Sequence, residues 1–420
     1  MKKFTIAILG CGNRGADSYG AYMHEAAEKF EIAALCDCDK NKLENCGKRF
    51  NVKSDNLFTS ETEFFKERRA DAVVVATQDK DHVRHAIRAM ELGYDILLEK
   101  PLTDKIVECE KLLEAHKKYK VKVLVCHVLR YAPAFVKVAD LLSDGAIGRL
   151  VAIQALEQVS YWHQAHSYVR GNWRKCEETT PMILAKCCHD LDLLQYYAKS
   201  KCESISSVGG LTYFTEKNAP ENSAERCADC ELIESCPYSA KRIYLDGWKE
   251  QGHPNCWPFT VLAGDGSEVS EKKLENAVRN GQYGRCVYRC DNDAVDHQLT
   301  QITFENGVKA TLTMTAFTKN GGRKMTFFGT LGEIILDEER GVIEIKPFGA
   351  ETETIKINEM KEAGHAHGGG DKMLVGAFYG MLCGNTDCGT TLEASVESHL
   401  MGICAEQSRK SGGGLFFVHR

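Results

Sequence analysis

The first 127 residues alternate short apolar runs with longer amphipathic segments. Five of the apolar runs do not alternate apolar and polar residues as a half-exposed strand does. This lack of alternation is typical of buried parallel strands. The five runs cover residues 5–9, 31–37, 72–77, 95–99 and 122–127. The segments 82–92 and 104–118 between them have the apolar spacing of helices. Strands and helices that alternate in this way predict a Rossmann domain with a doubly wound parallel sheet over residues 1–127.

From residue 128 the pattern becomes that of an α+β domain. Residues 129–143 have helical spacing, and from Leu150 onward apolar and polar residues alternate over longer runs. The tripeptide Glu305-Asn306-Gly307 lies between two such runs and predicts a tight hairpin. We therefore expect residues 128–420 to form a largely antiparallel open sheet with helices on one face. Such a sheet can pair with a second copy, so we expect a homo-oligomer.

Composition and charge narrow the classes of partner. The chain has 420 residues, of which 43% are hydrophobic and 27% charged, and its net charge is −6. This slight acidity argues against nucleic acid or an anionic membrane as the partner. No apolar run approaches the roughly 18 residues of a membrane helix. The start of the chain lacks the apolar core of a signal peptide, so we expect a cytoplasmic protein.

Three glycines directly follow the first predicted strand and open a helix. In this context Gly10 permits a tight turn, Gly12 lets the backbone approach a pyrophosphate, and Gly15 lets the helix pack on the strand. The first helical residues, Asn13 and Arg14, lie at a helix N-terminus, where N–H groups and the helix dipole attract phosphate. The spacing predicts a dinucleotide-binding turn.

A carboxylate at the end of the second predicted strand bears on the choice of dinucleotide. Asp37 follows Gly15 by about twenty residues, the position from which an acidic side chain receives the ribose hydroxyls. It would repel a 2′-phosphate, and the next residues, Cys38 and Asp39, offer no arginine to accept one. The sequence therefore predicts NAD rather than NADP as the cofactor.

Two further motifs are more specific than the glycines. Leu98-Glu99-Lys100-Pro101-Leu102 ends a predicted strand, and Cys188-His189-Asp190-Leu191-Asp192-Leu193 follows in the second domain. Together with the glycines they make the chain similar to the glucose–fructose oxidoreductase / inositol dehydrogenase / MocA (Gfo/Idh/MocA) family. The segment Gly329-Thr330-Leu331-Gly332-Glu333 also resembles a turn of that family's sheet. The resemblance spans nearly the whole chain and implies an NAD-dependent oxidoreductase that transfers a hydride from a sugar or polyol hydroxyl.

The resemblance also implies the roles of residues around the cofactor. Thr77 and His82 would lie along the nicotinamide side, and Glu99 and Lys100 beside the nicotinamide ring. Pro101 would hold the turn through a cis bond after Lys100. A lysine in a desolvated pocket next to the positively charged nicotinamide can act as a base.

The acid–base residues implied by the resemblance are Lys100 and His189. Asp192 follows His189 by three residues, so on a helix it would orient the imidazole or contact the substrate. In many family members an aspartate stands where this chain has Ala185, and Lys186 comes next. Lys186 is therefore either a further catalytic residue or a cation that neutralises nearby carboxylates.

An aromatic and basic run after a predicted strand provides candidate substrate contacts. Aromatic faces stack on the C–H surfaces of sugars, and polar side chains add hydrogen bonds. The alternative is an aromatic loop packed on the sheet. With a tyrosine at the domain junction, the candidates are Tyr131, Trp162, His163, His166, Arg170 and Trp173.

Nineteen cysteines in a chain expected in a reducing compartment predict free thiols or metal ligands rather than disulfides. Several lie within residues 215–295, a polar and weakly periodic stretch that we call the insertion. We expect it to hold too few apolar residues to fold alone, so a structural zinc would stabilise it. The alternative is a set of unpaired thiols. The candidate zinc ligands are Cys227, Cys230, Cys236 and Cys286, with Cys290 as the alternative fourth ligand.

Three functions stay open at this point. The first is a dehydrogenase for a sugar, inositol or another polyol. The second is an NAD-dependent glycoside hydrolase, which oxidises a sugar hydroxyl transiently, eliminates the glycosidic group, adds water and reduces the product again. The third is a non-catalytic NAD sensor, against which the pairing of Lys100 with His189 argues. In the first two cases the substrate is a small sugar, polyol or glycoside.

Overall fold

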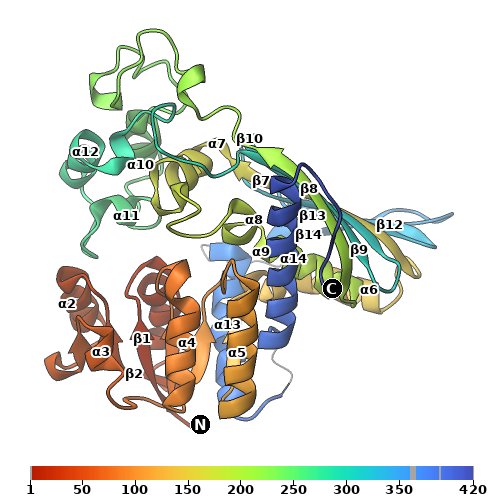
Figure 1. The fold of residues 1–420 in the computed structure, drawn as a ribbon, viewed down its shortest axis with the longest axis horizontal. Coiled ribbons are helices and arrows are strands. Elements are labelled where there is room, and N and C mark those ends of the chain that lie inside the picture. Colours follow the sequence, from red (N-terminus) through yellow and green to blue (C-terminus); the bar gives the residue numbers. More distant parts are fainter. Residues whose placement is uncertain (1, 360–365, 387–388, 420) are drawn as a thin grey trace.

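The computed structural model describes residues 2–359, 366–386 and 389–419, and it contains two separate sheets (Figure 1). The first sheet has six parallel strands in the order β3-β2-β1-β4-β5-β6. Its strands are β1 (Phe4–Leu9), β2 (Phe30–Cys36), β3 (Leu57–Phe58), β4 (Ala72–Val75), β5 (Asp95–Leu98) and β6 (Val123–Val125). The helices of this part are α1 (Ala21–Glu25), α2 (Lys40–Arg49), α3 (Glu61–Phe64), α4 (His82–Glu91) and α5 (Ile106–Tyr119).

The central strands of this sheet are apolar because both of their faces are covered. All four residues of β4 are buried, as are Ile96, Leu97 and Leu98 of β5. Helix α13 (Gly370–Leu382), which comes from near the end of the chain, returns to pack against the first helical turn of the Rossmann domain. The predicted Rossmann domain is therefore confirmed, and the C-terminal part of the chain contributes to its packing.

The second sheet has nine strands in the order β14-β13-β12-β11-β7-β10-β9-β8-β15. All pairings are antiparallel except that of β7 with β10. The turn before β10 has Gly307 at φ +89°, as the hairpin signal predicted. The strands are β7 (Leu150–Ser160), β8 (Cys202–Gly210), β9 (His297–Phe304), β10 (Lys309–Thr318), β11 (Gly322–Gly329), β12 (Gly332–Asp337), β13 (Val342–Pro347), β14 (Glu353–Lys356) and β15 (Phe416–Phe417).

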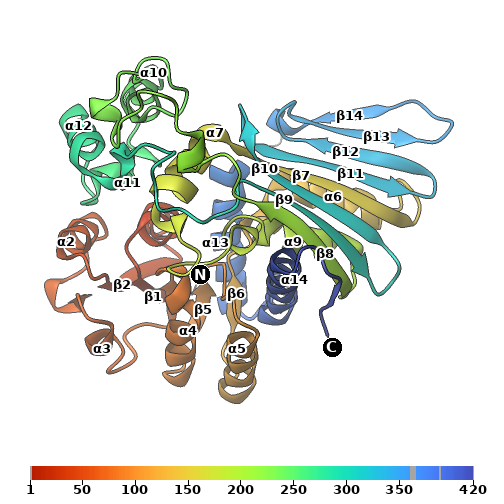
Figure 2. The same ribbon diagram turned by 45° about the horizontal axis from the view of Figure 1, so that its top comes forward.

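Helices cover one face of this sheet and leave the other open (Figure 2). The covering helices are α6 (Pro133–Ser143), α9 (Cys188–Ala198) and α14 (Leu392–Lys410). The open face exposes the apolar side chains of Val208, Leu299 and Phe328. The predicted α+β architecture with a largely antiparallel open sheet is confirmed.

One helix begins later than predicted. A helix was expected over residues 129–143, but α6 begins at Pro133 and follows a separate short turn over Val128–Tyr131. The ring of Pro133 fixes φ and removes an N–H donor, so proline is suited to the first turn of a helix and not to its interior.

The insertion, which we expected to hold too few apolar residues to fold alone, contributes to a buried cluster that also includes Ala165, Val169, Phe214 and Ala316 from outside it. The insertion contains α10 (Gly247–Glu250), α11 (Phe259–Ala263) and α12 (Glu271–Asn280), and its aromatic side chains form a second buried cluster. Tyr244 is fully buried in this cluster. The first two helices are only four and five residues long, so no apolar period could be read from the sequence.

None of the helices in the described part of the chain combines the length and the apolar character that crossing a membrane requires.

Candidate active site

The glycine turn after β1 has the geometry that dinucleotide binding requires. Gly10 has φ +95°, and a Cβ there would lie 2.3 Å from the carbonyl oxygen of Ala76. A Cβ on Gly15 would lie 1.9 Å from the carbonyl oxygen of Gly10. At Gly12, by contrast, a Cβ would meet no atom within 4 Å, so the turn is open on this side. The open side of Gly12, followed by the helical turn Asn13–Gly20, leaves room for a pyrophosphate to approach the backbone.

Asp37 lies just after β2, beside this turn. The N–H of Cys11 donates to Oδ2 of Asp37 at 2.7 Å, and the N–H of Asp39 donates to Oδ1 at 2.9 Å. Each carboxylate oxygen has a second lone pair that can accept a hydroxyl group. The carboxylate is thus fixed in place and retains the capacity to accept ribose hydroxyls.

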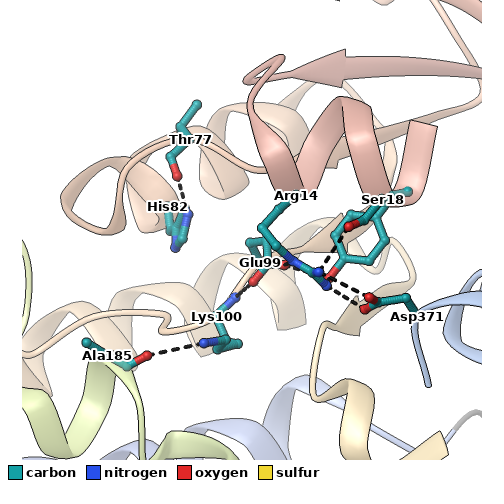
Figure 3. A network of polar contacts seen from close by, with 9 residues as sticks. Arg14, Ser18, Thr77, His82, Glu99, Lys100, Ala185 and Asp371 are labelled. Atoms are coloured by element: carbon teal, nitrogen blue, oxygen red, sulfur yellow. Dashed lines mark hydrogen bonds and ion pairs between the residues drawn. The ribbon is translucent and has the colours of Figure 1, made fainter. Parts of the chain in front are cut away.

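Arg14 lies between two carboxylates rather than in the open part of the turn (Figure 3). Its Nε donates to Oε1 of Glu99 at 2.8 Å, and its Nη2 donates to Oδ1 of Asp371 at 2.6 Å. The hydroxyl of Tyr19 also donates to Oε1 of Glu99. Burial alone would raise the pKa of Glu99, but Arg14 and Lys100 outweigh it and lower that pKa. The role visible for Arg14 is therefore to join the Rossmann domain to α13.

Asp371 was not among the predicted site residues. Its partner Arg14 is 357 positions away in the chain, and such a pairing leaves no local signal. Part of the preceding glycine-rich loop, including His365, lies outside the described residues.

The Lys100 segment follows the carboxyl end of β5. The Lys100–Pro101 peptide bond is cis, as the resemblance implied. The ring of His82 contacts the carbonyl oxygen of Thr77 through Nε2 at 3.0 Å (Figure 3). Its Nδ1 contacts the carbonyl oxygen of Pro101 at 2.7 Å. Nζ of Lys100 donates to the carbonyl oxygen of Ala185 at 3.2 Å. The lysine therefore reaches from the Rossmann sheet to the end of α8 (Met182–Ala185) in the second domain.

A row of buried histidines lies beside this lysine. The ring of His127 is 5.9 Å from that of His189 and 5.8 Å from that of His399. Burial is the main cause that lowers the pKa of His127 to about 4 and that of His399 to about 3, and the charge of Lys100 contributes to both shifts. His127 thus lies near Lys100 and in contact with His189. His399 carried no sequence signal, because it is one residue within a long buried helix.

The chain matches two family models that together cover most of its length. Residues 4–127 match the oxidoreductase family with an NAD-binding Rossmann fold, and residues 139–415 match the C-terminal alpha/beta domain of the same family. The protein belongs to the Gfo/Idh/MocA family.

Relatives and solved structures agree with this assignment. The chain is 25% identical over 390 residues to the putative oxidoreductase YteT of Bacillus subtilis, covering 88% of this chain and 87% of that protein. It is 25% identical over 260 residues to the 2,7-anhydro-N-acetylneuraminate hydratase of Mediterraneibacter gnavus, covering 61% of this chain and 64% of that protein. A levoglucosan dehydrogenase in complex with NADH and L-sorbose has the same fold, with a TM-score of 0.71, 15% identity and full coverage of both chains.

In this Gfo/Idh/MocA protein, Lys186 is held in a buried group of charges. Nζ of Lys186 lies 3.0 Å from Oε1 of Glu157, and Arg323 binds both Glu157 and Asp190. Burial raises the pKa of Asp190 to about 6, although Arg323 opposes the shift. The contact seen for Lys186 is the neutralisation of a carboxylate, one of the two roles considered for it.

Asp192 is held by a bidentate contact with Arg130. Nε and Nη2 of Arg130 each donate to one of its oxygens at 2.7 Å. Its Oδ2 also lies 3.8 Å from Nδ1 of His127. Asp192 therefore faces His127 and Arg130, which the sequence analysis did not include in the catalytic set.

The candidate substrate residues divide into two groups. Tyr131, Trp162, His163 and Trp173 are half-buried, and the indole N–H of Trp173 donates to Asp79 Oδ2 at 3.0 Å near the cofactor side. His166 and Arg170 are buried against the insertion. His166 stacks on Tyr283 with ring centroids 4.8 Å apart.

Every cysteine that the structure describes is a free thiol. Across the described ranges, no three His, Cys, Asp or Glu side chains are arranged as a ready metal-binding group. Four of the five candidate zinc ligands nevertheless line one cavity in the insertion, namely Cys227, Cys230, Cys236 and Cys286.

Proposed function

We propose that the protein is an NAD-dependent oxidoreductase that acts on a hydroxyl group of a sugar or polyol. The observation that carries the proposal is the position of Lys100, which leaves the carboxyl end of β5 and reaches Ala185 of the second domain. In open α/β sheets ligands bind at this end of the strands. A substrate held by the second domain would therefore meet the cofactor at Lys100.

The residues of the glycine turn fit NAD. Gly12 provides the open backbone for the pyrophosphate, and Asp37 provides a fixed carboxylate for the ribose hydroxyls. The carboxylate would repel a 2′-phosphate, which favours NAD over NADP. When bound, NAD accepts a hydride from the carbinol carbon.

Lys100 and His189 would manage the proton of the reacting hydroxyl. In its neutral form Lys100 can take that proton, and its contact with the Ala185 carbonyl fixes Nζ at the domain interface. His127 lies near both His189 and Lys100, so these two residues would act on the same part of the substrate. The half-buried side chains Tyr131, Trp162, His163 and Trp173 are the proposed contacts to the substrate.

A redox-neutral reaction is the second candidate function. Two observations favour it: Ala185 occupies the position of a frequent family aspartate, and one relative is named a hydratase. In that reaction a glycoside would be oxidised, cleaved by elimination, hydrated and reduced, without net change of the nicotinamide.

The two candidates are separated by their products. The purified protein would be incubated with NAD and a panel of free sugars, polyols and glycosides, while NADH absorbance and released aglycone are both measured. Net NADH that requires Lys100 supports the dehydrogenase, and released aglycone at constant NADH supports the redox-neutral enzyme. Tight NAD binding without formation of either product would contradict both proposals.

We further propose that the open face of the second sheet pairs with another copy of the chain. Val208 and Leu299 face each other across β8 and β9 and are about half exposed, at 50% and 47%. Leu299→Lys should shift the protein to a smaller species in light scattering, because it places a charge in an apolar contact. An unchanged mass, or a wild-type protein that is already monomeric, would contradict this.

A further inference from the structure

One buried arginine of the insertion region has no charged partner. Arg170 is fully buried, and its Nε and Nη2 donate to the carbonyl oxygens of Arg285 and Tyr238, each at 2.7 Å. Its Nη1 has no hydrogen-bond partner, and among the described residues no carboxylate forms an ion pair with it. A guanidinium stays protonated in proteins, so burial cannot neutralise it. A buried charge without a counter-charge costs several kcal/mol.

The side chains near this guanidinium are the thiols of Cys227 and Cys290 and the hydroxyl of Tyr244. Nη2 of Arg170 lies 3.5 Å from Sγ of Cys227, which also accepts the N–H of Ala240 at 3.4 Å. Arg170 lines a cavity of about 20 Å³ together with four thiols. These are Cys227, Cys230, Cys236 and Cys286.

The backbone brings these cysteines together from distant parts of the insertion. Arg226 and Arg285 form an antiparallel bridge in which the N–H of Cys286 donates to the carbonyl oxygen of Glu225, so Cys227 and Cys286 lie diagonally across the bridge. Cys230 closes a single turn on Cys227 through its N–H, and Cys236 lies at the next turn. These two turns and the bridge therefore place four sulfurs around the same cavity.

We propose that these four cysteines bind a metal centre as thiolates, and that its net negative charge balances Arg170. Four thiolates around a dication leave a charge of about −2, which supplies the missing partner of the guanidinium. Donation from Arg170 and from the Ala240 N–H to Cys227 stabilises the thiolate form.

The size of the cavity bears on the kind of centre. Its volume of about 20 Å³ holds roughly one water-sized atom, which favours a single zinc ion over an iron–sulfur cluster. The described side chains are not yet in ligand geometry, so binding requires the sulfurs to turn inward to about 2.3 Å from the zinc. An iron–sulfur cluster would use the same four thiolates and is distinguished by its iron and sulfide.

The structure also separates the two candidates for the fourth ligand. Cys286 lines the cavity, whereas Cys290 does not, and Sγ of Cys290 donates to the carbonyl oxygen of Cys286 at 3.3 Å. Cys290 is therefore the matched control, since it lies in the same segment and carries the same thiol.

The first measurement is made on the wild-type protein purified without chelators or a histidine tag. Metal analysis and acid-labile sulfide should give about one zinc per chain, or about four iron and four sulfide if the centre is a cluster. Thiol titration under native conditions should show about four additional reactive thiols after chelation. A chain with neither metal, and with a thiol count that chelators do not change, would overturn the proposal.

Variants then test the ligands and the counter-charge. Cys227→Ser and Cys286→Ser should lose at least 80% of the metal, while Cys290→Ser should retain it. Arg170→Met should weaken retention at least tenfold in a chelator competition, because it removes the balancing charge. Equal metal loss in Cys290→Ser and Cys286→Ser, or full retention in Cys227→Ser, would contradict the assignment. If the serine variants do not fold, the wild-type measurements decide.

Discussion

Two arginines of this protein, one half-buried and one fully buried, have opposite kinds of partner. Arg14, beside the nucleotide turn, binds the carboxylates of Glu99 and Asp371. Arg170, in the insertion region, has two backbone carbonyls and a thiol as partners and one N–H group without any. The charges around Arg14 are balanced by side chains of the chain itself. In our proposal the charge of Arg170 is balanced by a bound metal centre, which would make the cavity beside it a binding site, whereas the Arg14 group is a structural set of ion pairs.

The largest expected effect concerns Lys100, which lies next to the ion-paired group of Arg14. Lys100→Met should lower turnover by about 100- to 10,000-fold, the usual contribution of a general acid–base residue. NAD binding and the unfolding midpoint should change far less than turnover, because the hydrogen bond from Arg14 still holds Glu99. Initial rates with the best substrate from the panel measure the effect. Lys105→Met, at a nearby exposed lysine, is the control, and a fall of less than threefold in Lys100→Met would refute the role.

Next in size is the removal of the balanced arginine itself. Arg14→Met leaves the buried carboxylates of Glu99 and Asp371 without their partner, so the free energy of unfolding should fall by about 3–5 kcal/mol. Urea unfolding followed by fluorescence measures it. Arg84→Met breaks an exposed pair with Glu61 and should cost less than about 1 kcal/mol. Similar losses of unfolding free energy in the two variants would show that the ion pairs of Arg14 contribute no more to stability than an exposed pair.

The smallest expected effect concerns a buried histidine. Unlike a buried arginine, a histidine can release its proton. Burial, assisted by the charge of His127, lowers the pKa of His399 to about 3. Between pH 6.5 and about 3 the unfolded chain binds a proton there that the native chain does not, so native stability falls as the pH decreases.

His399→Gln should therefore reduce the loss of stability between pH 7 and pH 5 by about 1–2 kcal/mol. Urea midpoints at the two pH values provide the measurement, and His24→Gln at the surface is the control. A pH dependence as steep in His399→Gln as in the wild type would mean that this histidine is already protonated in the native state.

The sequence was most informative where a feature depends on neighbouring residues. The glycine turn, the position of Asp37 just after β2 and the hairpin at Gly307 were predictable because backbone conformation and strand alternation are encoded locally. The start of α6 at Pro133 could have been predicted from the same kind of local rule, and the helical pattern alone missed it. The two motifs around Lys100 and His189 likewise identified the family from short segments.

Sequence alone thus determined the order of the two folds, the glycine turn and the family, and the proposal of Lys100 and His189 for proton transfer rests on that family resemblance. Tertiary structure decided which charges meet: Asp371 with Arg14, His399 with His127, and Arg170 with the cysteines of the insertion. It also decided that the aromatic residues of the insertion form a core, since short helices leave no period to read. The physical reason is that long-range pairing follows from how buried surfaces pack, and a single sequence carries no local pattern for it.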